Sequence, residues 1–399
     1  MEYRNVKPAA LLDKWCVHAY YTICPWAPDG SGRLLFAAAD LDTKTNRIYV
    51  ADKDGKILHS FAESACTSSF WHTGRFQTWS PDAKYVYYQG GTVSAPLTVK
   101  HNIETGEEFF ACGNMEGAPP FGEPIIGGAQ GMLYAAGYGT GCYRPEESPY
   151  PFGARDKHGL FRFHFGGGRE ELVLSVADVL AAHPKRDELL LLDKEMQRKL
   201  GGECGLTLMC YCVRYNMQGN RFLFYFGNHC QARKEPKISY VFTCNADFTN
   251  LRLAVDMCGA SGYHFSWHPD GERLIGYGPH PKDRKKACLV TVNYDGSDYR
   301  VISDHNAGHP SVCPTDYDLI ASDDRIEVNG KKTGRVVLIC AQTGKIEQEY
   351  FIENRNNNEE TSIRNEHWVC HHPVFDRDGK RLLVNSLSGR NACLLEIKL

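Results

Sequence analysis

Trp267-His268-Pro269-Asp270-Gly271 is the clearest copy of a short phrase that returns along this chain of 399 residues. Each copy joins an apolar or aromatic residue to a tight polar turn, and another apolar segment follows. Pro presets φ, Asp bonds its own backbone and Gly accepts a positive φ, which is the chemistry of a hairpin turn. The other copies are Trp26-Ala27-Pro28-Asp29-Gly30, Trp79-Ser80-Pro81-Asp82 and Phe375-Asp376-Arg377-Asp378-Gly379, with degenerate copies at Ala129-Gln130-Gly131, Met217-Gln218-Gly219 and Pro314-Thr315-Asp316.

The spacing of these seven phrases predicts the fold. Most successive turns are separated by close to the roughly 40–50 residues that one four-stranded propeller blade needs. Each turn precedes a β-branched or aromatic segment such as Tyr85-Val86-Tyr87-Tyr88, and a second hairpin follows, as at Val337-Leu338-Ile339-Cys340. The repeats span nearly the whole chain, so we predict an all-β, seven-bladed β-propeller forming a single domain over residues 1–399.

The two ends of the chain are expected to meet in one blade. The last repeat stops at Leu394-Leu395-Glu396-Ile397, before its fourth strand. An unpaired edge at that place would be a template for aggregation. The segment from Tyr3 to Leu12 is therefore predicted to supply the missing strand and close the ring.

The long interval between Gln130 and Gln218 holds the one strongly helical stretch, residues 175–200. His183-Pro184 is expected to divide it into two helices. We predict a helical insertion between the third and fourth repeats. Its sequence fits a decoration on the rim of the ring and also a wall over the central pocket.

Composition restricts the class of protein. The net charge is −3 with acids and bases mixed, which argues against a nucleic-acid partner. No apolar run approaches 18 residues, so no membrane span is expected. The N-terminal residues show no signal-peptide pattern, and the 16 cysteines then read as reduced, mostly buried side chains of a cytoplasmic protein. Oligomeric state is not encoded in any of these features.

Histidines recur at equivalent positions of three consecutive repeats. His264 precedes Trp267, His309 precedes the sixth turn phrase, and His372 precedes the seventh. Inner strands of a propeller run beside its axis, so three imidazoles from adjacent blades are expected to meet there. Neutral imidazole suits divalent metals, and a metal or a directly bound substrate is predicted at this point. His367 is the fourth candidate ligand, whereas the alternative is that each histidine only caps its strand.

The segments that carry these histidines resemble a known enzyme family. Gly262-Tyr263-His264-Phe265-Ser266-Trp267, Ala307-Gly308-His309-Pro310-Ser311 and the stretch from His371 to Lys380 resemble the propeller-type polysaccharide lyases, nearest to the oligogalacturonate lyases and more distantly to the ulvan lyases. Gly137-Tyr138-Gly139 and the segment from Asp156 to Arg162 also resemble that group. The resemblance covers most of the chain through short motifs.

The resemblance implies a seven-bladed propeller that cleaves uronic-acid oligosaccharides by β-elimination with a divalent metal, manganese or zinc, with calcium as a further option. It places the metal on His264, His309 and His372. The chain departs from the family pattern where Cys370 replaces a histidine of a Gln-x-x-His-x-His run. It departs again in the fourth repeat, where Tyr211-Cys212-Val213 replaces an Asn-His pair.

Elimination across C4–C5 of a uronate needs a neutralised carboxylate, a base for the C5 proton and a partner for the leaving oxygen. Tyr138 and His72 are the candidate bases, and Arg144 and Arg214 are the candidate partners of the carboxylate or the leaving group. Further candidates for substrate binding occur in the same loops and are Arg75, Arg155, His229 and Arg233.

Other functions fit parts of the sequence. A non-catalytic propeller of the TolB or WD type, binding a protein or a carbohydrate, is the main alternative, because the fold does not set the function. A serine hydrolase would need a Gly-x-Ser-x-Gly elbow, which is absent. A glycosidase would use paired carboxylates, for which Glu123, Asp304 and Asp323 are available.

Overall fold

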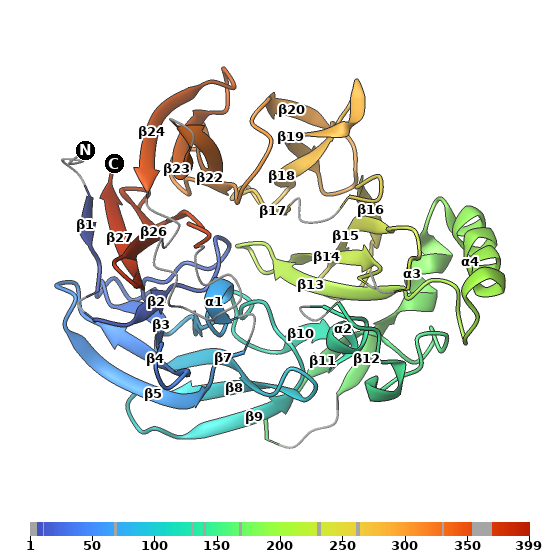
Figure 1. Ribbon diagram of the computed structural model, residues 1–399, viewed down its shortest axis with the longest axis horizontal. Coiled ribbons are helices and arrows are strands. Elements are labelled where there is room, and N and C mark those ends of the chain that lie inside the picture. The colour runs from blue at the N-terminus through green and yellow to red at the C-terminus, as the bar shows by residue number, and fades with distance from the viewer. Residues whose placement is uncertain are drawn as a thin grey trace.

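The computed structural model describes residues 6–10, 12–67, 70–129, 131–138, 141–166, 170–229, 233–260, 264–328, 331–352 and 369–399. Its strands form seven antiparallel sheets arranged as a ring around a central axis (Figure 1). The chain is a seven-bladed β-propeller, which confirms the prediction from the repeated phrase.

The blades follow chain order, and the strands of each blade pair as successive neighbours. Blade 1 contains β2 (Trp15–Val17), β3 (Leu34–Asp40), β4 (Thr45–Ala51) and β5 (Ile57–Ala65), blade 2 contains β6 (Thr78–Trp79), β7 (Tyr85–Gly91), β8 (Pro96–Asn102) and β9 (Glu108–Cys112), and blade 3 contains β10 (Ile125–Gly128), β11 (Gly159–Phe163) and β12 (Glu171–Ser175). Blade 4 contains β13 (Met209–Tyr215), β14 (Arg221–Gly227), β15 (Ser239–Asn245) and β16 (Arg252–Asp256), and blade 5 contains β17 (Ser266–Trp267), β18 (Arg273–His280), β19 (Asp283–Asn293) and β20 (Arg300–Ser303). Blade 6 contains β21 (Ser311–Val312), β22 (Leu319–Val328), β23 (Lys331–Cys340) and β24 (Ile346–Ile352), and blade 7 contains β25 (Val374–Phe375), β26 (Arg381–Ser388), β27 (Asn391–Lys398) and β1 (Val6–Pro8).

The N-terminal strand closes the ring as predicted. Strand β1 pairs antiparallel with β27, with Val6 opposite Ile397 and Pro8 opposite Leu395. The two ends of the chain lie side by side in Figure 1. Strand β1 is the outer edge of the blade, a position that tolerates a proline because no further strand needs its amide.

The third blade departs from the repeat. Three strands belong to it in the described part of the chain, and a long excursion separates β10 from β11. This excursion contains α2 (Met132–Ala135), which starts after Gly131 at a φ of 74°, and the short 3-10 helix η1 (Pro145–Glu147). The prediction of a hairpin turn at Ala129-Gln130-Gly131 is therefore wrong. Turn residues alone do not explain the difference, because Met217-Gln218-Gly219 also lacks Pro and Asp and still turns between β13 and β14.

Two helices follow the third blade, at the place predicted from periodicity. Helix α3 (Val176–Ala182) is capped by Ser175, whose side chain exchanges hydrogen bonds with Asp178, and α4 (Arg186–Leu200) begins after the His183-Pro184 break. Their apolar side chains pack with the phenylalanines of β14 and β15 at the outer edge of the ring (Figure 1). The insertion decorates the rim.

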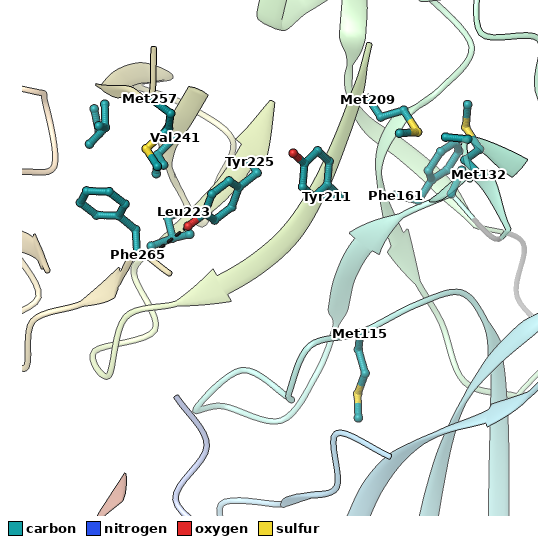
Figure 2. Close-up of a cluster of buried hydrophobic side chains, with 14 of the residues drawn as sticks. Met115, Met132, Phe161, Met209, Tyr211, Leu223, Tyr225, Val241, Met257 and Phe265 are labelled. Atoms are coloured by element: carbon teal, nitrogen blue, oxygen red, sulfur yellow. Dashed lines mark hydrogen bonds between the residues drawn. The ribbon is translucent and has the colours of Figure 1, made fainter. Parts of the chain in front are cut away.

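The largest apolar core joins blades 2 to 5. Figure 2 shows Leu223 and Tyr225 of β14 packing toward Val241 of β15 and Phe265 of the next blade. Burying one such side chain contributes about 1.5–3 kcal/mol, so contacts between neighbouring blades hold the ring together. No helix among the described residues is both long and apolar enough to cross a membrane.

Candidate active site at the centre of the ring

Three histidines predicted from the repeats meet at the axis. His264, His309 and His372 each lie three residues before the last residue of the inner strands β17, β21 and β25. The ring of His309 stacks on that of His264 with 4.2 Å between centroids, and it meets the ring of His372 edge-on at 4.2 Å. Residues from three blades therefore form one cluster.

Asp323 of β22 organises this cluster. One carboxylate oxygen accepts hydrogen bonds from the backbone N–H and the Nδ1 of His309, both at 2.8 Å. The other oxygen accepts from the backbone N–H groups of His371 at 3.1 Å and His372 at 3.3 Å. Burial alone would raise the pKa of Asp323, but the charge and hydrogen bond of His309 hold it well below its usual range. The carboxylate stays ionised and holds a proton on His309 Nδ1, so Nε2 is the ring nitrogen available to a ligand.

The other two imidazoles are held neutral. His264 Nδ1 bonds the carbonyl oxygen of Gly308 at 3.0 Å, which leaves its Nε2 with a lone pair. Burial, followed by the neighbouring His309, lowers the pKa values of His264 and His372 well below the usual range. Both residues have a positive φ, 43° and 46°. Such strain in non-glycine residues gathers at functional sites, where the surrounding structure maintains it.

Close packing of Gly308 supports this geometry. Its φ is 108°, and a Cβ there would lie 1.6 Å from the backbone oxygen of Asp323. Only glycine fits, so the loop that presents His309 is pressed against β22. The carbonyl oxygen that orients His264 is fixed by the same contact.

The donor set fits a divalent metal by its chemistry. Imidazole nitrogens, one of them on a ring backed by a carboxylate, are ligands that first-row divalent metals take. Among the described residues, no three His, Cys, Asp or Glu side chains already stand in a coordination arrangement. His367 lies outside the described residues. Cys370 lines the cavity into which the three histidines open, and burial raises the pKa of its thiol.

His18, which the sequence analysis missed, lies beside the cluster. It follows the inner strand of blade 1, is fully buried, and its ring centroid lies 6.2 Å from that of His372. Its backbone N–H donates to Asn385 Oδ1 at 3.1 Å. Burial lowers the pKa of His18 to about 4, although hydrogen bonds to the backbone of His371 and His372 act to raise it. A repeat phrase could not reveal it, because it stands eight residues before Trp26 and so out of phase with the other three.

We expect stability to fall as the pH drops from about 6.5 to 4. The unfolded state takes up a proton on His18 near pH 6.5, whereas the folded state does so only near pH 4. The unfolded state therefore binds more protons in this window, and His18 alone removes about 3 kcal/mol of unfolding free energy across it. Urea unfolding at pH 7, 5.5 and 4 measures the slope. His18→Gln should reduce the dependence of the unfolding free energy on pH, and His164→Gln, at an exposed site, should leave it unchanged. An unchanged dependence in His18→Gln contradicts the assignment of this effect to His18.

The cluster opens into a cavity of about 470 Å³, called here the histidine cavity. Besides the three axial histidines and Asp323, its walls include His72 from helix α1 (Phe70–Thr73), Tyr138 and Arg325 of β22. Burial lowers the pKa of His72, with further effects of Arg325 and His309, and desolvation raises the pKa of Tyr138. A neutral His72 accepts a proton at neutral pH, whereas Tyr138 keeps its own.

Arg325 was not singled out from the sequence. It is exposed, lies in the cavity wall, and its Nη2 is 3.5 Å from Cys370 Sγ. A guanidinium is the side chain best shaped for a carboxylate. It lies near the end of β22, where buried and exposed residues alternate, and nothing in the sequence distinguishes it from other surface arginines.

Arg214 lies beneath the histidine cavity and outside its walls. It is buried, pairs with Glu116 at 3.2 Å, and donates to the backbone oxygen of Phe265 and to Tyr21 Oη. Tyr21 in turn donates to the backbone oxygen of His264 at 2.7 Å. Arg214 thus supports the loop that carries His264 through its Nη1 and Nη2 donors, whereas its buried Nε has no hydrogen-bond partner.

The remaining predicted arginines do not meet at the axis. Arg144 pairs with Glu147, Arg155 with Asp193 at 2.6 Å, and Arg233 donates to the backbone oxygen of Cys204 at 2.8 Å. None of the three lines the histidine cavity. They hold the excursion of the third blade and the helical insertion, both of which are rich in loop carbonyls and acids.

Arg75 and His229 line a second cavity of about 190 Å³, the aromatic cavity. The ring of His229 lies edge-on to Tyr138 at 5.4 Å and to Tyr211 at 4.7 Å. Burial lowers the pKa of His229 to about 3. No residue of α3 or α4 borders either cavity, so the insertion does not form a wall of the described site.

Comparison with known proteins places the fold. The sequence matches no family profile and no curated protein. The structure is similar to an oligogalacturonate lyase in complex with manganese, at a TM-score of 0.64 and 16% identity over 100% of this chain and 95% of that one. It is also similar to an oligogalacturonate lyase from Vibrio parahaemolyticus, at a TM-score of 0.60 and 14% identity over 98% and 93%. At these identities the likenesses show the propeller fold alone, so the resemblance to oligogalacturonate lyases is one of fold, and they give no support to the resemblance to ulvan lyases.

Proposed function

We propose that the protein is a lyase that cleaves uronic-acid-containing oligosaccharides by β-elimination with the help of a divalent metal. The observation that carries the proposal is one cavity in which neutral imidazoles, a proton acceptor, a protonated phenol and a guanidinium converge. Each of these groups has a role in uronate elimination, and together they provide a residue for every step of the reaction.

The first requirement is a neutralised carboxylate. Arg325 would pair with the uronate carboxylate, which makes the C5 proton more acidic. Nitrogens of His264, His309 and His372 would hold the metal, which when bound supplies additional positive charge at the carboxylate. The solved structure of this fold in complex with manganese makes manganese the first metal to test.

The second requirement is proton transfer at C5 and at the leaving oxygen. His72 would accept the C5 proton; the C4–O4 bond breaks as the C4–C5 double bond forms, and Tyr138 would donate its phenolic proton to O4. The directions of the two pKa shifts favour this division, since His72 is held neutral and Tyr138 is held protonated. Of the two bases that the sequence suggested, the electrostatics favour His72.

A substrate panel with and without metal tests this function. Purified protein loaded with manganese should convert at least one uronic-acid oligosaccharide to an unsaturated product that absorbs in the near ultraviolet. A chelator should abolish the product and added manganese should restore it, and the matching neutral oligosaccharide should not react because its C5 proton is not acidic. His264→Ala and His309→Ala should each lose bound metal. No product from any uronate, or metal content unchanged in both variants, would refute the proposal.

A further inference from the structure

The aromatic cavity continues the histidine cavity. Tyr138 belongs to the walls of both cavities. Thr73 lines the histidine cavity, and the next residue, Gly74, lines the aromatic cavity. A saccharide whose reacting unit lies in the histidine cavity therefore extends its neighbouring unit past Tyr138 into the aromatic cavity.

The walls of the aromatic cavity are mainly apolar. Tyr138, Tyr211 and His229 present aromatic rings, and Met115, Met132 and Met209 lie around them. In Figure 2 these methionines and Tyr211 come from separate segments, the loop before β10, helix α2 and strand β13. Aromatic faces suit the apolar face of a sugar ring, and methionine side chains adapt to irregular shapes.

The positive charge in the described wall of the cavity is largely engaged by the protein. Arg75 is the one arginine or lysine among its described wall residues. Its Nε donates to the backbone oxygen of Gln89 at 2.7 Å, its Nη1 donates to Ala62, and its guanidinium lies 4.5 Å over the ring of Tyr88. Its Nε, its Nη1 and one face of the guanidinium are therefore engaged by the protein itself.

The other titratable groups of the cavity disfavour an anion as well. The carboxylate of Glu116 is paired with Arg214, which is not part of the cavity wall. His229, whose pKa is about 3, carries no charge at neutral pH. A uronate placed here would lose its hydration and gain at most the remaining nitrogen of Arg75 as a cationic partner, which is costly.

We propose that the aromatic cavity selects an uncharged sugar unit next to the reacting uronate, so that the preferred substrate is a mixed oligosaccharide and not a run of uronates. The inference rests on the proposed function for the identity of the reacting unit. It assigns the histidine cavity to the charged sugar and the aromatic cavity to a neutral or esterified one.

Calorimetric binding tests this preference without relying on turnover. The probes are a disaccharide of two uronates and the matching disaccharide in which the second uronate is the corresponding neutral hexose, each in both linkage orders. The mixed disaccharide should bind about tenfold more tightly or better in one order, because the diuronate buries an unpaired carboxylate. Equal or tighter binding of the diuronate, or no binding of either probe, overturns the inference. Formation of unsaturated product from the diuronate alone would leave the proposed function standing while this inference fails.

A charge placed at the cavity should shift the preference. Val93 is 42% exposed in the turn after β7 and lines the aromatic cavity. Val93→Lys should raise the affinity for the diuronate relative to the mixed disaccharide by about threefold, the size expected for a partly exposed ion pair. Val301→Lys adds the same charge on exposed β20, outside both cavities, and should leave the ratio as in the wild type. Equal shifts in the two variants would show that total charge, and not this cavity, sets the preference.

Discussion

Asp323→Asn is expected to destabilise the fold by about 3 kcal/mol and to weaken binding of manganese by about 10–100-fold. The carboxylate of Asp323 accepts from four N–H groups, two on each oxygen. An asparagine amide turns one side into a donor, so in either orientation its NH₂ faces N–H groups at a buried site. The proton of His309 is then no longer fixed on Nδ1, and the loop carrying His371 and His372 loses its anchor.

Urea unfolding and titration with manganese measure the two effects. Asp378→Asn, at an exposed position in the turn of the seventh blade, changes the same charge and should leave both quantities near the wild-type values. If Asp323→Asn binds manganese with unchanged affinity, then Asp323 does not orient the metal-binding histidines, whatever its effect on stability.

His72→Ala is expected to lower kcat by about 10²–10⁴-fold, the usual contribution of a positioned general base. Manganese content and unfolding free energy should stay close to those of the wild type, since His72 lies on the short helix α1 in the cavity wall and not among the proposed metal ligands. His164→Ala, which removes an exposed imidazole far from the cavity walls, is the matched control.

The pH profile separates a base from a structural side chain. Burial lowers the pKa of His72, so kcat should fall only as the pH drops below about 6.5, through that lowered value. This acid limb should disappear from the residual activity of His72→Ala. A variant with full kcat, or with the wild-type acid limb at reduced kcat, would show that another group takes the C5 proton.

The third blade shows how a local rule fails. The turn phrase predicts a hairpin wherever Pro, Asp and Gly impose it, and six of the seven copies do mark the turn between two strands of a blade. After β10 the chain leaves the sheet for α2 and returns only at β11, whereas Met217-Gln218-Gly219, which also lacks Pro and Asp, still turns between β13 and β14. Turn residues alone therefore do not decide where a hairpin forms. The fold tolerates this because contacts between blades, and not one turn, hold the sheet in the ring.

The arginines show a different limit. Arg144, Arg155 and Arg233 fit a carboxylate by residue type, but Glu147, Asp193 and backbone carbonyls take their guanidinium groups. Arg325 has the same residue type and lies at the cavity. Residue type is the same in all four, so only the position of each strand and loop around the axis distinguishes them.

The sequence by itself determined the ring, its number of blades, its closure by the first strand and the meeting of His264, His309 and His372. Turn chemistry and strand periodicity are local properties of the chain, and equal positions in successive repeats fall at equal distances from one axis. Only the tertiary structure decided that Asp323, His18 and Arg325 join those histidines and that the five predicted arginines do not. Ring closure brings together residues of blades 1, 6 and 7 that are hundreds of positions apart in the sequence. Packing between blades then decides which side chains face the cavity, and a repeat pattern contains no information on that packing.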